Sequence, residues 1–223
     1  NEGKQIIGFA GSTLFGLENE LDKYGREPHS VIGSSCIGAS IVGGVCNNSG
    51  GALVKRGPAY TELSLYAKIN SDGKLELVND LGVDLGNSES EILNNLQSKN
   101  YNQDQIQFPK KLASDNEYKS RIRDVDAGTP ARYNADRRRL YGASGCAGKV
   151  AVFAVRLDTY LKPNKSSVFY IGCNKPENFS RIRRFFFNSL KIFGNVSSID
   201  FSFAPELNLA FFVIFIGVLV PAT

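Results

Sequence analysis

The sequence is poor in the residues that most often carry chemistry. Its 223 residues include no methionine, no tryptophan and a single histidine, His29, and its four cysteines form no CxxC pair. Because metal sites draw their ligands from closely spaced cysteine and histidine residues, we predict no metal site. The GxGxxG and GxxxxGK[ST] patterns are also missing, which argues against a Rossmann dinucleotide site and against a nucleoside triphosphatase.

The scarcity of histidine also limits acid–base catalysis. His29 lies between Pro28 and a glycine-rich run, where a structural or surface role is favoured over that of a general base. Glu62 and Asp158 stand apart from other candidate groups, so no Ser-His-Asp or Cys-His set can be assembled from the sequence. We therefore nominate no catalytic residue.

The cysteines and the beginning of the chain bear on its compartment. We interpret Cys36, Cys46, Cys146 and Cys173 as small, reduced, buried residues, which favours a cytosolic protein, although an even number leaves disulfides open. The first five residues lack the apolar core of a signal peptide, and the sequence does not begin with methionine. We expect it to begin within a domain.

The excess positive charge lies in two short arginine clusters, and the longest apolar run lies near the end of the sequence. Two arginine clusters, Arg137 to Arg139 and Arg181 to Arg184, account for the net charge of +4. We interpret them as solvated faces. The alternative is a patch facing anionic lipid headgroups, where each charge contributes about 1 kcal/mol. Leu209 to Val220 is uncharged but shorter than the roughly 20 residues of a membrane-spanning helix, so we expect a buried or membrane-surface segment. No recognition pattern accompanies the arginines, which argues against a nucleic-acid partner.

Hydrophobic periodicity and turn residues predict alternating strands and helices. The clearest feature is Val150 to Val155, a continuously apolar run typical of a strand that is covered on both faces. Gln97 to Asp126 is polar, and we expect a long surface excursion there. The other predicted strands are Gln5 to Phe9, Ser64 to Asn70, Lys74 to Asn79 and Ser167 to Ile171. Three helices are predicted. The first begins after Ser12 or Thr13 and ends at Gly25, the second begins after Ser88, and the third runs from Pro176 to Ile192.

The segment from Ser30 to Val54 has no charged side chain and is punctuated by glycines, so we expect a buried loop or a ligand cradle. Backbone N–H groups that converge on phosphate oxygens can hold a dinucleotide without lysine or arginine, and glycine permits that close approach. The second half of the segment would let a flat ring lie against the backbone, with Asn47 and Asn48 bonding its polar edges. The alternative is a glycine-rich packing loop.

Several motifs in this region and beyond it resemble the family of quinone-dependent D-lactate dehydrogenases, flavoenzymes with an FAD-binding domain of the vanillyl-alcohol-oxidase (PCMH) type. The resemblance extends from about Gln5 to Arg184 and ends there. The motifs are Gly25 to Ser40, Cys46 to Gly51, Arg56 to Glu62, Thr129 to Asp136, Ser144 to Lys149 and Ala151 to Thr159.

The resemblance implies an α+β fold, the second lobe of a PCMH-type FAD-binding domain that leads into the start of a cap region. The expected division is a partial FAD-binding domain at 1–158, the start of the cap region at 159–184, and a divergent apolar tail at 185–223. Noncovalent FAD would be contacted at four positions. Gly33 and Ser40 would lie by the phosphates, Gly50 by the flavin, and Val152 on the central strand beneath the cofactor.

The resemblance also implies a function. The family oxidises D-lactate to pyruvate by hydride transfer to the flavin and passes the electrons to a membrane quinone, which places it peripherally on the cytoplasmic side of the inner membrane. D-lactate and quinone would be the partners, while the oligomeric state stays open. The family's N-terminal lobe and substrate-binding region have no counterpart here, so we expect an incomplete fragment. The alternative for the chain itself is a noncatalytic flavin-binding or membrane-surface remnant.

Overall fold

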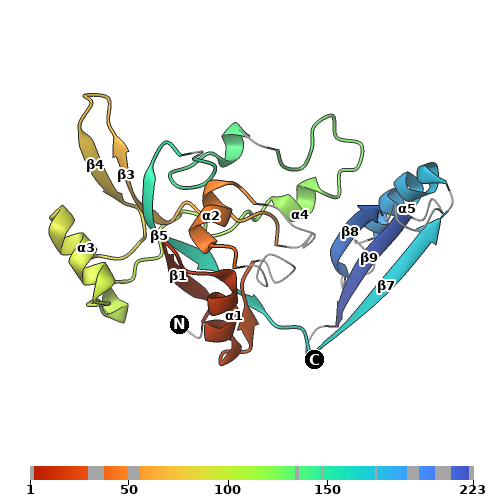
Figure 1. Ribbon diagram of the computed structural model, residues 1–223, viewed down its shortest axis with the longest axis horizontal. Helices are drawn as coiled ribbons and strands as arrows, with labels where there is room; N and C mark the ends of the chain where they lie inside the picture. The colour runs from red at the N-terminus through yellow and green to blue at the C-terminus, as the bar shows by residue number, and fades with distance from the viewer. Residues whose placement is uncertain are drawn as a thin grey trace. The chain divides into compact units, whose positions relative to one another are not determined.

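The computed structural model of the chain describes residues 3–29, 38–49, 56–133, 136–146, 148–173, 175–189, 196–203 and 212–220. These residues fall into two compact units of mixed helices and antiparallel strands (Figure 1). The first unit comprises residues 1–49, 58–115 and 134–160, and the second comprises residues 50–57, 116–133 and 161–223. The division into 1–158, 159–184 and 185–223 stays a prediction.

A four-stranded antiparallel sheet forms the centre of the first unit. In spatial order its strands are β1 (Gln5–Phe9), β5 (Ala151–Asp158), β3 (Ser64–Ile69) and β4 (Leu75–Asn79). Successive side chains of β5 point to opposite faces, so Val155 packs into one hydrophobic cluster and Ala154 into another. The prediction of a central strand covered on both faces is confirmed.

Two helices cover one face of this sheet. In α1 (Leu14–Asp22), the apolar residues Leu14, Leu17 and Leu21 recur at helical spacing and are all buried. They pack with Ile41 of α2 (Ile41–Cys46) in the cluster that contains Val155. The helix begins as the sequence predicts, and the structure selects Thr13 as its cap, whose Oγ1 accepts a hydrogen bond from the Gly16 N–H at 3.1 Å.

The opposite face is covered by α3 (Glu89–Gln97), whose Leu96 packs in the second cluster with Leu65 of β3. The helix begins after Ser88 as predicted, and the Ser88 Oγ accepts from the Glu91 N–H at 3.3 Å. The Glu91 carboxylate accepts from the Asn87 N–H at 3.0 Å. A reciprocal capping box would instead return that carboxylate to the Ser88 N–H.

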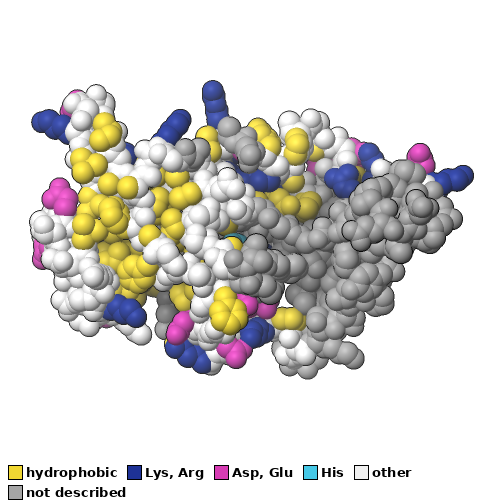
Figure 2. All heavy atoms as spheres, in the orientation of Figure 1, with side chains coloured by type: hydrophobic (Ala, Val, Ile, Leu, Met, Phe, Trp, Pro, Cys, Tyr) yellow, Lys and Arg dark blue, Asp and Glu magenta, His cyan; other side chains and the backbone are white. Residues whose placement is uncertain are grey.

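The predicted hairpin between β3 and β4 is confirmed. Gly73 has φ of +76°, and the Asn70 Oδ1 accepts from the N–H groups of Asp72 at 3.0 Å and Lys74 at 2.9 Å. Figure 2 shows apolar side chains gathered on this side of the molecule. Ile69 and Leu75 face each other across the two strands and are exposed by 64% and 76%.

The glycine-rich segment contains a helix that the sequence did not predict. Gly43 and Gly44 both disfavour α2, by roughly 1 kcal/mol each relative to alanine. The helix forms because Ser40 caps it and because Ile41 and Val45 are completely buried. Tertiary packing therefore outweighs local propensity here, and the expectation of a loop throughout Ser30 to Val54 is wrong for these residues.

In the described residues of the second unit, the chain forms a three-stranded antiparallel sheet and two helices. In spatial order its strands are β7 (Lys165–Cys173), β9 (Phe212–Val220) and β8 (Val196–Phe203). The helices are α4 (Tyr118–Arg121) and α5 (Pro176–Ser189), so the predicted strand and the predicted start at Pro176 are confirmed. In the described part of the chain, no helix is long and apolar enough to cross a membrane.

Two short strands and two single helical turns connect the larger elements. The strand β2 (Arg26–Glu27) pairs with β6 (Tyr160–Leu161) where the first unit ends. Two single turns of 3-10 helix, η1 (Gln103–Gln105) and η2 (Arg137–Arg139), lie in irregular segments. The polar stretch predicted as a surface excursion is irregular apart from η1 and α4.

Candidate functional site

The structure describes two of the four predicted FAD contacts. Ser40 caps α2, and Val152 of β5 packs against the cluster that contains Ile41 and Val45 of the same helix. The two predicted residues therefore adjoin one structural feature, the helix α2 on its sheet. Gly33 and Gly50 lie outside the described residues, as does most of the predicted phosphate cradle.

The chain at Ser40 is held from both sides. The Leu14 N–H donates to the Ala39 carbonyl and the Ile41 N–H donates to the Ser12 carbonyl, each at 2.9 Å. The Ser40 Oγ accepts from the Gly43 N–H at 3.1 Å. In this bond the Ser40 hydroxyl oxygen is the acceptor, so the Ser40 O–H can still donate a hydrogen bond to a ligand.

We expect Ser40→Ala to lower the free energy of unfolding of the first unit by about 1 kcal/mol through loss of the helix cap. Thr13→Ala is the matched control, since Thr13 makes the same 3.1 Å cap on α1 and is not a predicted FAD contact. Urea denaturation would measure both losses, and titration with FAD would separate the variants. If Ser40 contacts FAD, the affinity for FAD should fall in Ser40→Ala and stay unchanged in Thr13→Ala. An equal affinity in both variants would contradict a role for Ser40 in binding.

A cavity of about 540 Å³ opens at the other end of α2. It is lined by residues 46–48, which end the helix, and by parts of the segment 140–150, which leads into β5. This volume falls within the range of roughly 300–1,000 Å³ that ligand pockets occupy. Among the described residues that line this α2 cavity, Lys149 alone carries a formal charge, and Asn47, Asn48 and Tyr141 contribute hydrogen-bonding groups.

A close backbone approach shapes this cavity. The Gly145 N–H donates to the Val45 carbonyl at 3.1 Å, which ties the segment 140–150 to α2. Gly145 has φ of +66°, and a Cβ built there would lie 2.4 Å from the Asn48 Nδ2. Asn48 itself has φ of +47° and is buried. Any residue other than glycine at position 145 would therefore clash with the Asn48 amide in the cavity wall.

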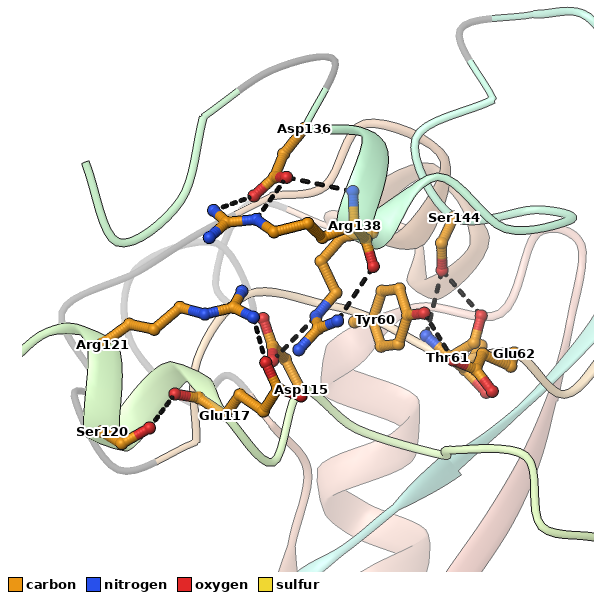
Figure 3. Close-up of polar contacts among 11 residues, drawn as sticks. Tyr60, Thr61, Glu62, Asp115, Glu117, Ser120, Arg121, Asp136, Arg138 and Ser144 are labelled. Atoms are coloured by element: carbon orange, nitrogen blue, oxygen red, sulfur yellow. Dashed lines mark hydrogen bonds and ion pairs between the residues drawn. The ribbon is translucent and has the colours of Figure 1, made fainter. Parts of the chain in front are cut away.

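Ser144 fixes the same segment to the core. Its hydroxyl donates to the Thr61 carbonyl at 2.7 Å and accepts from the Thr61 N–H at 3.0 Å (Figure 3). The Thr61 hydroxyl in turn donates to the Arg156 carbonyl in β5 at 2.6 Å. All three residues are buried, so these hydrogen bonds anchor the cavity wall to the core of the first unit.

Two thiols also line the α2 cavity. Cys46 and Cys146 are both free and half-buried. Burial, together with the neighbouring Cys146 thiol, raises the pKa of Cys46 to about 12. Cys46 is therefore a protonated thiol at neutral pH and is not a nucleophile there.

The arginine run Arg137 to Arg139 is only in part the solvated face that the sequence predicted, because Arg137 and Arg138 are exposed and Arg139 is buried. Arg139 is 6% exposed, and its Nε donates to the buried Asp115 at 3.0 Å while its guanidinium lies 5.5 Å from the centre of the Tyr60 ring. Arg138 donates to the two carboxylate oxygens of Asp136 at 2.7 and 2.6 Å. The solvated-face interpretation is wrong for Arg139, because a buried carboxylate from a distant segment neutralises it.

The acidic residues considered from the sequence are structural. Glu62 accepts bonds from the Tyr60 hydroxyl at 2.8 Å and from the Leu112 N–H at 3.0 Å. Asp158 accepts from Gln5 at 2.8 Å and from Ser114 at 2.6 Å. Within the described ranges, no three His, Cys, Asp or Glu side chains come together as a potential metal site.

Comparison with known proteins shows which sequences this chain resembles. No family model matches the chain. A protein of Escherichia coli K12 is 57% identical over 183 residues, 82% of this chain and 32% of that protein. A protein of Haemophilus influenzae Rd is 59% identical over 184 residues, 82% of this chain and 33% of its own length. A Corynebacterium glutamicum protein is 43% identical over 186 residues, 83% of the chain and 32% of that protein.

These relatives are oxidoreductases of the dehydrogenase class. In particular, each bears the name quinone-dependent D-lactate dehydrogenase, so the resemblance inferred from the motifs is confirmed. The chain spans about one third of the length of these relatives. The match therefore concerns one part of a larger enzyme.

Proposed function

We propose that this chain forms part of the FAD-binding domain of a quinone-dependent D-lactate dehydrogenase, the second lobe of a PCMH-type fold, and that the α2 cavity receives the flavin ring. The observation that carries the proposal is the coincidence of a cavity of about 540 Å³ with the segment predicted to hold the ring. The names of the relatives support the class of enzyme.

The residues of the α2 cavity suit a flat, polar-edged ring. The Asn47 and Asn48 amides supply both donors and acceptors, as the edge of an isoalloxazine requires, and the glycine at position 145 keeps the wall free of a side chain. Lys149 supplies a positive charge that favours electron-rich ring atoms. When bound, FAD would accept the hydride of the substrate.

The activity of the whole enzyme is part of the proposal. D-lactate would be oxidised to pyruvate, and the electrons would pass to a quinone at the cytoplasmic face of the inner membrane, with the enzyme bound peripherally. The described residues of this chain hold and orient the cofactor and exclude water from one side of it. For the chain by itself, which spans a third of its relatives, we favour flavin binding without turnover.

FAD titration of the purified chain tests the proposal. We expect quenching of flavin fluorescence on binding, co-elution of FAD with the chain in gel filtration, and no D-lactate-dependent reduction of a dye. Asn47→Ala should weaken binding about tenfold, equivalent to one lost hydrogen bond of roughly 1.4 kcal/mol. Asn100→Ala, on an exposed loop beyond α3, should leave it unchanged. A folded chain that does not bind FAD would refute the proposed function. Oxidation of D-lactate by the chain would refute the proposal that the chain by itself binds flavin without turnover.

A further inference from the structure

The two thiols of the α2 cavity come from segments that are far apart in the sequence. Cys46 is the last residue of α2, and Cys146 lies in the segment that leads into β5. Both side chains line the α2 cavity, and both are free. Two half-buried thiols therefore meet at the wall of one cavity.

The backbone holds this pair in register. The residues just before the two cysteines, Val45 and Gly145, are joined by the 3.1 Å bond from the Gly145 N–H to the Val45 carbonyl. Ser144 and Thr61 exchange two further bonds that anchor the same segment. The two backbone segments are therefore tied together one residue before each cysteine, which keeps the two thiols on neighbouring parts of the cavity wall.

We propose that Cys46 and Cys146 form a reversible disulfide across the α2 cavity, and that its formation excludes the flavin ring. The existence of the disulfide is independent of what the cavity binds. Its effect on the flavin rests on the proposed function. Cys46 and Cys146 would thus be a modification site in the wall of the α2 cavity.

A peroxide is the class of oxidant that we name for this step. The first thiolate attacks one peroxide oxygen, the O–O bond breaks, and water leaves after protonation, which produces a sulfenic acid. The second sulfur then attacks the sulfenic sulfur, an S–S bond forms and a second water leaves. Overall, two thiols lose two electrons and two protons, and one hydrogen peroxide becomes two waters.

The protonation of Cys46 sets the conditions for this reaction. Since burial raises the pKa of Cys46 to about 12, the thiolate form is scarce at neutral pH and grows as the pH rises toward that value. Formation of the bridge should therefore be faster at pH 9 than at pH 7. Reduction by dithiothreitol should reverse it.

Mass spectrometry of the full chain tests the bridge directly. The chain is oxidised with hydrogen peroxide under native conditions, free thiols are blocked, and the protein is digested with trypsin. Trypsin separates Glu27–Lys55, which holds Cys36 and Cys46, from Leu140–Lys149, which holds Cys146. The variant Cys36→Ser/Cys173→Ser leaves the two cavity thiols as the only pair, and the unsubstituted chain, with fragmentation to assign the sulfurs, serves if that variant fails to fold.

We expect a cross-linked peptide pair that joins Cys46 to Cys146 within one chain and disappears on reduction. Recovery of both peptides separately, each fully blocked, would overturn the inference. Cross-links that join only different chains would overturn it as well.

A second arm separates this inference from the proposed function. Bridged and reduced chains are titrated with FAD, and we expect at least a tenfold weaker affinity in the bridged form, restored by dithiothreitol. Equal affinity in both forms would overturn the claim that the bridge excludes the ring. A chain that forms the bridge and binds no FAD in either form would refute the flavin proposal alone, because the cross-linked peptide would still establish the disulfide.

Discussion

Replacing Asp115 with alanine should lower the free energy of unfolding of the first unit by about 3–5 kcal/mol, the typical effect of removing one partner from a buried ion pair. Asp115 and Arg139 are 3% and 6% exposed, so the variant leaves a guanidinium inside the protein without its carboxylate. The Tyr60 ring, 5.5 Å from that guanidinium, offsets only a small part of the loss.

Urea denaturation followed by far-ultraviolet circular dichroism would measure the change. Glu20→Ala is the matched control, because its ion pair with Lys23 at 2.9 Å is exposed and its loss should have no measurable effect. The double variant Asp115→Leu/Arg139→Met removes both charges and should recover much of the stability. Equal effects of Asp115→Ala and Glu20→Ala would show that the pair is not buried as described.

Replacing Gly145 with alanine should destabilise the first unit by about 2–5 kcal/mol. A residue with a Cβ at a φ of +66° costs about 1–2 kcal/mol in backbone strain. The added Cβ would also lie 2.4 Å from the Asn48 Nδ2 and 2.7 Å from the Leu140 Cδ2, and such overpacking costs roughly 1–3 kcal/mol. The same change displaces the wall of the α2 cavity, so FAD affinity should fall as well.

Gly148→Ala isolates the backbone contribution. Gly148 has φ of +81°, and a Cβ there would meet no atom within 4 Å. Its loss of stability should therefore be limited to about 1–2 kcal/mol. Thermal denaturation of both variants, with FAD titration of each, would compare them. Indistinguishable stabilities and affinities would contradict the close approach at Gly145 as the feature that shapes the cavity.

The elements that the sequence predicted well are those with strong local signals. The apolar run of β5, the leucines of α1 and the Asp72-Gly73 turn each encode a structure within a short window. The start of α3 after Ser88 is equally local. Such elements need only their own residues to be specified.

The features that the sequence missed depend on partners far along the chain. The helix α2 was missed because its glycines disfavour it locally, while its burial against β5 and α1 stabilises it. Arg139 was assigned to a solvated face because Asp115, 24 residues away, gives no local sign of pairing with it. The pairing of Gly145 with Val45 joins residues a hundred positions apart, although the motif from Ser144 to Lys149 had marked that segment as part of the resemblance.

The sequence by itself determined the order of most strands and helices and the resemblance to quinone-dependent D-lactate dehydrogenases, while the assignment of Ser40 and Val152 to FAD binding stays a prediction. The tertiary structure alone decided that α2 is a helix, that its end borders a cavity, and that Cys46 and Cys146 line this cavity together. The physical reason is the range of the forces. Turns, caps and periodic patterns act over a few residues, whereas cavities and buried pairs arise only when packing brings distant segments into contact.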